Sequence, residues 1–139
     1  MTRIVAFAVL LLTLPVCARQ QAVEIRPVLA TDPVTDDPDD PAIWVHPTDP
    51  GRSLVFGTNK VMAPTGALVG YGLDGKIRQV FAGLNRPNNV DVEYGLPVRG
   101  KKVDVAVVTE RLRGRLRVFR IAPDGSGFSD ISSLAGLRV

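Results

Sequence analysis

The sequence predicts an all-β fold made of repeated four-stranded sheets. Two Asp-Gly pairs, Asp74-Gly75 and Asp124-Gly125, are strong signals for the tight turns of β-hairpins. Thr58-Asn59-Lys60 and Thr109-Glu110-Arg111 each close the second apolar run of their half of the chain. No stretch after residue 18 has a helical periodicity of useful length. These observations predict two copies of one antiparallel unit.

The first copy follows a lead-in segment, where an expected strand at 23–29 is interrupted by Pro27. Apolar and β-branched runs then predict strands at 42–46, 53–58, 67–73 and 76–82. The segment 47–51 is expected to be a turn, because its two prolines and its glycine cannot continue a strand ladder. Asp74-Gly75 joins the last two strands of this copy.

The second copy repeats the same order after Asn88-Asn89. Strands are expected at 90–94, 102–109, 116–121 and 128–131, with a turn at 95–100. Asp124-Gly125 again supplies the last hairpin. Four-stranded units that recur every 40–50 residues or so, roughly the period of propeller repeats, are typical of β-propeller blades. We therefore expect about two blades of a β-propeller.

Two blades cannot close a ring, because each blade buries its faces against its neighbours. The sequence also ends at residues 136–139, where the next strand would begin. We therefore expect residues 19–139 to be the N-terminal, incomplete part of a propeller domain. An isolated fragment of this kind is expected to have little or no activity.

Residues 1–18 have the pattern of a secretory signal peptide. Arg3 supplies the positive end, 4–14 the apolar core, and Val16-Cys17-Ala18 a small-residue cleavage site. The core is shorter than the roughly 20 residues of a membrane-spanning helix. A lipoprotein signal at Cys17 is the weaker alternative, because Val16 is bulky for the position before a lipidated cysteine. We expect a secreted or periplasmic protein without a permanent membrane span.

The composition gives no support to nucleic-acid binding. Among 139 residues, 17 Lys and Arg against 14 Asp and Glu give a formal net charge of only +3. No basic tract with interleaved aromatic residues is present. Acidic residues gather at 32–40 and basic residues at 111–120. This separation suits a site that handles both cations and anions.

Four carboxylates lie within the five residues of Asp36-Asp37-Pro38-Asp39-Asp40, directly before an apolar run. Calcium takes about six to eight oxygen ligands from carboxylates, backbone carbonyls and water. A stiff acidic loop at the mouth of a strand is therefore a candidate calcium site. The alternative, which the loop alone favours, is a solvated acidic turn, since Asp-Pro pairs are common turn formers.

The run Asp39-Asp40-Pro41-Ala42-Ile43-Trp44, followed by a Pro-rich turn, resembles the N-terminal signature of the β-propeller phytases. These are secreted, calcium-dependent enzymes that hydrolyse inositol hexakisphosphate. The resemblance implies a six-bladed ring and several calcium ions. It also implies that Asp36, Asp39, Asp40 and the Pro41 carbonyl supply ligands, with Asp39 at the edge of the active centre. Strand alternation points Asp39 and Asp40 to different sides, where they could serve different ions.

The segment Pro87-Asn88-Asn89-Val90-Asp91 resembles the Asn-Asn-Val-Asp element of the same family. Oxygens of Asn88, Val90 and Asp91 could complete the ion shell begun at Asp40. The alternative is an ordinary Asn-rich turn into a strand. With both motifs in matching register, calcium binding is the better interpretation.

Lys60 and Arg111 each follow the second strand of their blade, so propeller geometry would bring both to one rim. There they could hold phosphates, Arg111 as a bidentate fork and Lys60 as a point charge. The alternative is two solvated strand-end charges, but the resemblance favours catalytic and substrate-binding roles. Glu110 stands where the family often has asparagine, and it could pair with Arg111 and weaken its hold on an anion. Several arginines between 111 and 120 are expected to form one solvated face.

The motifs together predict a phosphoric monoester hydrolase of the 3-phytase type, monomeric when complete. Its substrate would be the calcium complex of phytate or another inositol phosphate. The rival hypothesis is a calcium-stabilised propeller that binds an anionic ligand without hydrolysing it. His46, the single histidine, lacks a nucleophile elbow with which to build a Ser-His-Asp set and is expected to be structural. Trp44 is expected in the core of the first blade.

Overall fold

The computed structural model describes residues 23–133, which contain strands and two short 3-10 turns but no α-helix. The expected signal peptide at 1–18, with Cys17, lies outside the described residues, as do residues 134–139. Within 23–133, no helix is long and apolar enough to cross a membrane.

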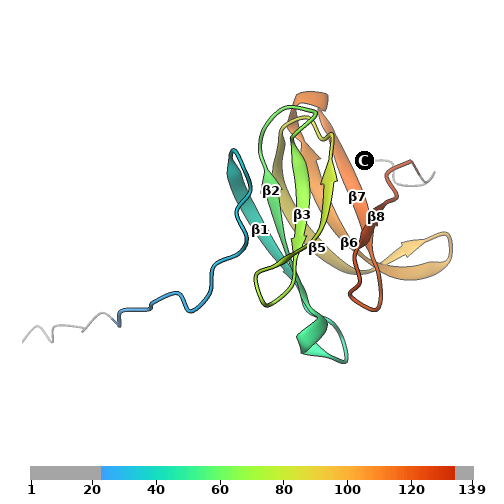
Figure 1. Ribbon diagram of the computed structural model, residues 1–139. Helices are drawn as coiled ribbons and strands as arrows, with labels where there is room; N and C mark the ends of the chain where they lie inside the picture. The colour runs from blue at the N-terminus through green and yellow to red at the C-terminus, as the bar shows by residue number, and fades with distance from the viewer. Residues whose placement is uncertain (1–22, 134–139) are drawn as a thin grey trace, which may run out of the picture.

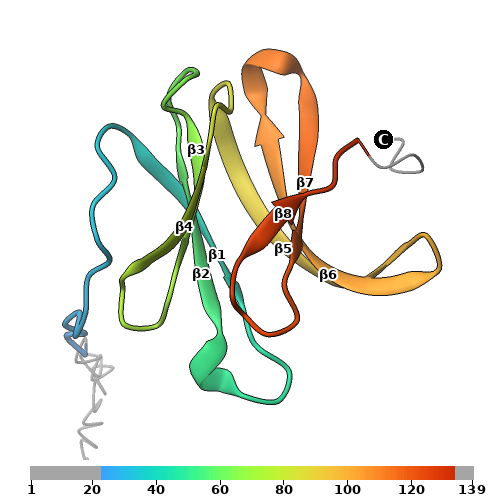
Figure 2. The same ribbon diagram turned by 45° about the vertical axis from the view of Figure 1, so that its right-hand side comes forward.

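Eight strands form two four-stranded antiparallel sheets, each with its strands in chain order. The first sheet contains β1 (Pro38–Trp44), β2 (Leu54–Asn59), β3 (Ala67–Tyr71) and β4 (Ile77–Ala82). The second contains β5 (Pro87–Val98), β6 (Lys101–Glu110), β7 (Arg115–Ile121) and β8 (Phe128–Asp130). The two sheets pack face to face (Figures 1 and 2). The all-β prediction and the prediction of two four-stranded units are confirmed, whereas the six-bladed ring stays a prediction.

The two sheets repeat each other in strand register. Pro38 pairs with Asn59 across β1 and β2, and Pro87 pairs with Glu110 across β5 and β6. Both pairings then shift register at the same place, between Pro38 and Pro41 and between Pro87 and Val90. Asn59 and Glu110 therefore occupy equivalent positions, at the end of the second strand of each unit.

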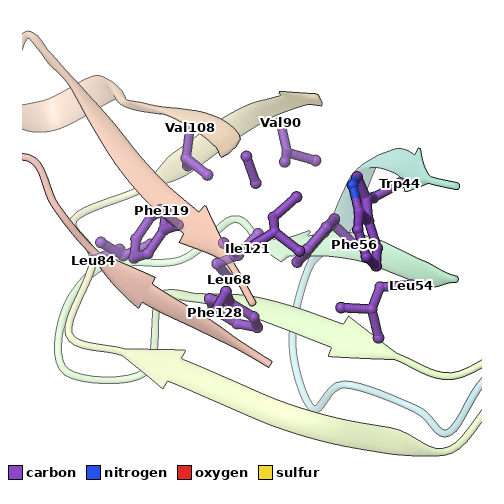
Figure 3. Close-up of a cluster of buried hydrophobic side chains, with 11 residues drawn as sticks. Trp44, Leu54, Phe56, Leu68, Leu84, Val90, Val108, Phe119, Ile121 and Phe128 are labelled. Carbon is purple, nitrogen blue, oxygen red and sulfur yellow. The ribbon is translucent and has the colours of Figure 1, made fainter. Parts of the chain in front are cut away.

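Apolar side chains from the facing sides of the two sheets form the main core (Figure 3). The first sheet contributes Trp44, Leu54, Phe56 and Leu68, the linker Leu84, and the second sheet Val90, Ala106, Val108, Phe119, Ile121 and Phe128. Trp44 is 1% exposed, and its Nε1 donates a hydrogen bond to Asp104 Oδ2 at 2.8 Å. The expected core position of Trp44 is confirmed, and the side chain also ties the first sheet to the second.

The outer face of each sheet is apolar as well. Ala67, Val69 and Tyr71 form a second cluster on the first sheet, and Val105, Val118 and Ile131 form a third on the second sheet. Sheets with two apolar faces are what face-to-face blades of a propeller require.

The segment 23–29 forms no strand, contrary to the sequence expectation, and its residues are exposed. The lead-in is held only from Asp32 onward. The Asp32 carboxylate accepts hydrogen bonds from Lys76 Nζ at 2.8 Å and from the Ile77 amide at 3.1 Å. These contacts attach the lead-in to the hairpin between β3 and β4, at the start of the edge strand β4.

The expected turn at 95–100 is shorter than predicted, because β5 continues to Val98. Gly95 has a positive φ of 68°, and its amide donates to Asp104 Oδ1 at 2.9 Å. This bulge satisfies the backbone locally and lets the strand go on. The chain reverses at Arg99 and Gly100, whose φ values of 48° and 77° are those of a two-residue type I′ hairpin.

Candidate functional site

The ends of β2 and β6 and the start of β5 lie at one end of the molecule, at the top of Figures 1 and 2. The backbone of Arg86 connects the two loops that follow β2 and β6. Its amide donates to the Val61 carbonyl at 2.9 Å, and its carbonyl accepts from the Arg111 amide at 3.1 Å. Since Val61 directly follows Lys60, the structure places Lys60 and Arg111 on one rim, as propeller geometry predicts. Their roles in binding stay predictions.

Lys60 is folded back onto the acidic loop. Its Nζ lies 2.9 Å from Asp39 Oδ1 and 3.8 Å from Asp37 Oδ2, and its amide donates to the Asp37 carbonyl at 2.8 Å. The Lys60 side chain is only 21% exposed. The structure therefore brings together two of the three expected catalytic residues, Asp39 and Lys60, as an ion pair.

The Asn59 side chain holds the acidic segment before β1 through hydrogen bonds. Its Oδ1 accepts the Asp37 amide at 3.0 Å, and its Nδ2 donates to Asp36 Oδ2 at 3.5 Å and to the Thr65 carbonyl at 3.2 Å. The residue is buried, so one amide side chain satisfies three polar groups without help from solvent. This arrangement fixes the loop before β1 relative to the end of β2.

Asp40 connects the acidic loop to the second expected motif. Its Oδ2 accepts the Val90 amide at 3.0 Å, across the boundary between the two sheets. The Thr58 hydroxyl accepts the Asp40 amide at 3.2 Å and donates to the Asn88 carbonyl at 3.5 Å. Asp39 and Asp40 thus contact different partners, in agreement with their predicted alternation.

The Asn-Asn-Val-Asp segment is only partly directed at the acidic loop. Asn88 Nδ2 donates to Asn89 Oδ1 at 2.8 Å, and the Asn89 amide donates to Thr109 Oγ1 at 2.9 Å, which repeats the contact between Asp40 and Thr58. The Asp91 carboxylate accepts the amide of its neighbour Val92 at 2.8 Å. Within residues 23–133, Asp91 has no hydrogen bond to the acidic loop.

The oxygen atoms at this junction are of the kinds that bind a hard cation, but its carboxylates do not surround one common point. Among the described residues, no three Asp, Glu, His or Cys side chains come together as a metal-binding group. Calcium, however, also accepts backbone carbonyl and amide oxygens. The Asp40 carboxylate, which accepts the Val90 amide, and the Asn88 carbonyl, which is linked to the Asp40 backbone through the Thr58 hydroxyl, are oxygens of these two kinds. The ligand roles expected for Asp36, Asp39, Asp40, Pro41, Asn88, Val90 and Asp91 stay predictions.

Glu110 does not pair with Arg111, and that part of the sequence expectation is wrong. Its side chain is fully buried, because the last residue of β6 points inward while Arg111 begins the 3-10 turn η2 (Arg111–Arg113). Glu110 Oε1 accepts the Asn85 amide at 2.9 Å, as Asn59 does for Asp37 in the first unit.

Three arginines converge on Glu110 instead. Arg115 Nε lies 2.7 Å and Arg117 Nη1 3.3 Å from Oε2, and Arg113 Nε lies 3.4 Å from Oε1. Burial alone would raise the pKa of Glu110, but the hydrogen bonds from Arg115, the Asn85 amide and Arg117 outweigh it and lower that pKa. Glu110 is therefore an ionised, structural carboxylate.

Arg117 is also no part of a solvated face. Its side chain is 13% exposed, forms an ion pair with Asp130, and lies over the rings of Phe81 and Phe119 at 5.5 and 5.9 Å from their centroids. The expectation of one solvated arginine face is therefore wrong for this residue. Thr58-Asn59-Lys60 and Thr109-Glu110-Arg111 occupy equivalent positions in the two units. This repeat is the sequence signal that could have predicted that Glu110, like Asn59, accepts a backbone amide of the preceding loop.

His46 lies at the other end of β1 from the acidic loop. It is buried, and its Nδ1 accepts the amides of Thr48 at 3.3 Å and Asp49 at 3.0 Å. These contacts support the structural role expected for this residue.

Gly66 lies where the rim loops meet, and it provides a test of their packing. A Cβ at this position would clash with the carbonyl oxygens of Val61 and Leu84. Both neighbours are backbone atoms, so Gly66→Ala is expected to lower the free energy of unfolding by about 1–3 kcal/mol in denaturant titrations. Gly57→Ala is the control, because its Cβ would lie at an ordinary 3.4 Å from the Tyr71 ring. Equal stability of the two variants would contradict the close packing around Gly66.

Comparisons with known proteins agree on one family. The family model described as Phytase matches residues 2–134. The 3-phytase of Bacillus subtilis (strain 168) is 41% identical over an alignment of 98 residues, which covers 68% of this chain and 24% of that protein. The chain thus spans about a quarter of the length of this curated relative.

Proposed function

The chain belongs to the phytase family, and on that premise we propose that the whole protein is a calcium-dependent phosphoric monoester hydrolase of the 3-phytase type. Its substrate would be myo-inositol hexakisphosphate or another inositol phosphate, bound as a calcium complex. One observation carries the proposal. Asp40 accepts the Val90 amide, and so joins the acidic loop to the Asn-rich segment at the rim that also carries Lys60 and Arg111.

The charges at this rim favour a cation as part of the binding site. Four carboxylates at 36–40, two of them at the start of β1, stand against the Arg111 guanidinium and the Lys60 ammonium, which already pairs with Asp39. A polyphosphate would be repelled by this excess of negative charge. A hard divalent cation would remove the repulsion, and the oxygens of the two motifs are of the kind that calcium prefers. Asp36, Asp39, Asp40 and the Pro41 carbonyl, with Asn88, Val90 and Asp91, are the residues proposed to hold it.

Bound calcium would supply charge neutralisation and polarisation of a phosphoryl oxygen. Side chains of this chain would bind the phosphates and balance the developing charge. Asp39 orients the Lys60 ammonium at the rim, where it would balance charge that develops on the phosphoryl oxygens. Arg111 is exposed and has no ion pair within residues 23–133, so its guanidinium is free to take a phosphate in a bidentate fork.

The location and assembly of the protein are part of the same proposal. The signal-like pattern at 1–18 supports export from the cytoplasm, either as a secreted or as a periplasmic protein. We propose a monomer for the whole protein, since a closed ring of blades would bury the apolar outer faces.

The test is phosphate release from inositol hexakisphosphate by the whole protein, followed with a colorimetric phosphate assay. Release is expected in the presence of calcium and is expected to fall when a chelator is added in excess, because the rim carboxylates then repel the substrate. Full activity in excess chelator would refute the calcium mechanism. Calcium-dependent binding of the ligand by calorimetry, without any phosphate release, would favour the non-catalytic rival.

A further inference from the structure

Residues 32–35, which we call the strap, connect the hairpin between β3 and β4 to the acidic loop. Asp32 and Val34 are partly buried, whereas Pro33 and Thr35 are exposed. This alternation is that of an extended segment with one side against the protein. In Figure 2 the lead-in, drawn in blue, runs beside the first sheet to the start of β1. The strap therefore links the hairpin end of the sheet to the rim.

The hairpin end of the strap is fastened by three hydrogen bonds. The Asp32 amide donates to the Gly75 carbonyl at 2.7 Å. The Asp32 carboxylate accepts from Lys76 Nζ at 2.8 Å and from the Ile77 amide at 3.1 Å. The chain passes so close to the turn that a Cβ on Gly75 would lie 2.6 Å from the Ala30 carbonyl oxygen. Asp32 is therefore the anchor of the strap.

The middle of the strap lies against the outer face of the first sheet. Val34 packs there against an apolar cluster that contains Ala67, Val69, Tyr71 and Val55. Pro33 fixes its own φ and favours an extended backbone at Asp32 before it. Thr35 alone separates Val34 from Asp36. The anchor and the apolar contact together restrict where the acidic loop can begin.

Asp36 has few other contacts that hold it in place. Its side chain accepts the hydroxyl of its neighbour Thr35 at 3.0 Å and the Asn59 amide group at 3.5 Å. Four carboxylates lie within the five residues 36–40, and they repel one another when no cation is bound. An attachment outside this segment is therefore needed to keep Asp36 near the other carboxylates, and the strap provides it.

We propose that Asp32 is a positioning residue for the cation site: it anchors the strap and so holds Asp36 in the arrangement that binds calcium. This inference rests on the proposed function and deepens it. Within residues 23–133, the Asp32 side chain has hydrogen bonds only with the hairpin, so it acts through the strap and not as a ligand. When the binding arrangement is less populated, the apparent Kd rises in proportion. Loss of the anchor therefore weakens calcium binding without changing the reaction at saturating calcium.

The experiment compares Asp32→Ala with the parent and with Asp124→Ala in the whole protein. Asp124 is a matched control, since its carboxylate also accepts two hydrogen bonds, from the amide and the hydroxyl of Ser126, in the corresponding hairpin of the second sheet. Calorimetric titration with calcium, without substrate, is expected to give a Kd about fivefold higher for Asp32→Ala. Asp124→Ala is expected to keep the parental Kd. Thermal unfolding shows whether each variant is folded.

Hydrogen exchange locates the effect in the acidic loop. In the calcium-free protein, the amides of Asp37 and Lys60 are hydrogen-bonded across the junction of the loop with β2. Peptides that contain these amides should exchange faster in Asp32→Ala than in the parent or in Asp124→Ala. A general loss of stability would instead increase exchange throughout both sheets. Faster exchange confined to the loop supports positioning by the strap.

Phosphate release at increasing calcium separates positioning from chemistry. The calcium concentration for half-maximal rate should rise about fivefold in Asp32→Ala, with kcat at saturating calcium unchanged. Asp32→Asn retains an oxygen that can accept the Ile77 amide, so its calcium midpoint should lie between those two, and this variant stands in if Asp32→Ala does not fold. Parental calcium affinity in the folded variant overturns the proposal. So does a kcat that stays low at saturating calcium.

Failure of this inference and failure of the proposed function give different results. If the parent binds calcium and releases phosphate, but Asp32→Ala keeps its calcium affinity, the strap has no positioning role while the function stands. If the parent binds calcium but releases no phosphate, the hydrolase is refuted, and calorimetry with hydrogen exchange still decides the role of Asp32. A parent that binds no calcium refutes both.

Discussion

Replacing Glu110 with alanine is expected to lower the free energy of unfolding by about 3 kcal/mol. Loss of one partner from a buried ion pair costs about 3–5 kcal/mol when the remaining charge stays buried. Here Arg113 and Arg115 are about half exposed and can be rehydrated, whereas Arg117 is only 13% exposed. The expected cost therefore lies at the lower end of that range.

The loss of a backbone contact adds to this cost. Glu110 Oε1 accepts the Asn85 amide at 2.9 Å, and alanine would leave that amide without its acceptor. Chemical denaturation of the whole protein measures the effect, with Glu93→Ala, an exposed glutamate of β5, as the control. We expect the control to stay within about 0.5 kcal/mol of the parent. A Glu110→Ala variant as stable as Glu93→Ala would show that the arginine cluster contributes nothing to stability.

The pH dependence of the Glu110→Gln variant tests the charge itself. Glutamine keeps an oxygen that can accept the Asn85 amide but loses the charge toward the arginines. Because the pKa of Glu110 is lowered in the folded protein, its ionised form contributes stability above the ordinary carboxylate pKa. This contribution is lost as the pH falls through the folded-state pKa. The difference in free energy of unfolding between parent and variant should thus be largest at neutral pH and should decrease in acid. A difference that does not depend on pH would contradict the ionised state assigned to Glu110.

Much of the fold follows from local sequence signals. The Asp-Gly pairs at 74–75 and 124–125 predicted two hairpins, and the structure has reversals at both places. Bulges were harder to predict, because they depend on distant side chains. Where β5 continues past Gly95, Asp104 of the neighbouring strand accepts the Gly95 amide.

In the candidate site, too, some features follow from the sequence and others depend on contacts that only the fold creates. The placement of Lys60 and Arg111 on one rim follows from their equivalent positions after β2 and β6. The orientation of Glu110 does not follow from its sequence neighbour Arg111. It depends on the approach of Asn85 and of the arginines of β7, which only the folded chain brings within reach. Residues adjacent in sequence at a strand end can point in opposite directions, and here a buried carboxylate and an exposed guanidinium do so.

Lys60→Ala and Arg111→Ala are each expected to lower kcat/KM for inositol hexakisphosphate about a hundredfold, the scale of losing one donor to a charged transition state. Both side chains come from the rim that Arg86 joins through its backbone. Steady-state kinetics of the whole protein at moderate salt provide the measurement. Lys102→Ala is the control, because Lys102 is exposed and lies at the opposite end of β6 from Arg111. The idea fails if both rim variants keep the parental kinetics.

The double variant distinguishes one shared substrate from two independent charges. If Lys60 and Arg111 hold one connected set of phosphates, removal of either loosens the ligand for the other, and the combined loss is smaller than the product of the single losses. Lys60→Ala also releases Asp39, whose carboxylate lies 2.9 Å from the ammonium, and a freed carboxylate at the rim would repel substrate by itself. Adding Asp39→Asn to Lys60→Ala removes that repulsion but also one of the proposed calcium ligands, so kcat should not recover. Full restoration of kcat would mean that Lys60 only neutralises Asp39 and does not act on the phosphoryl group.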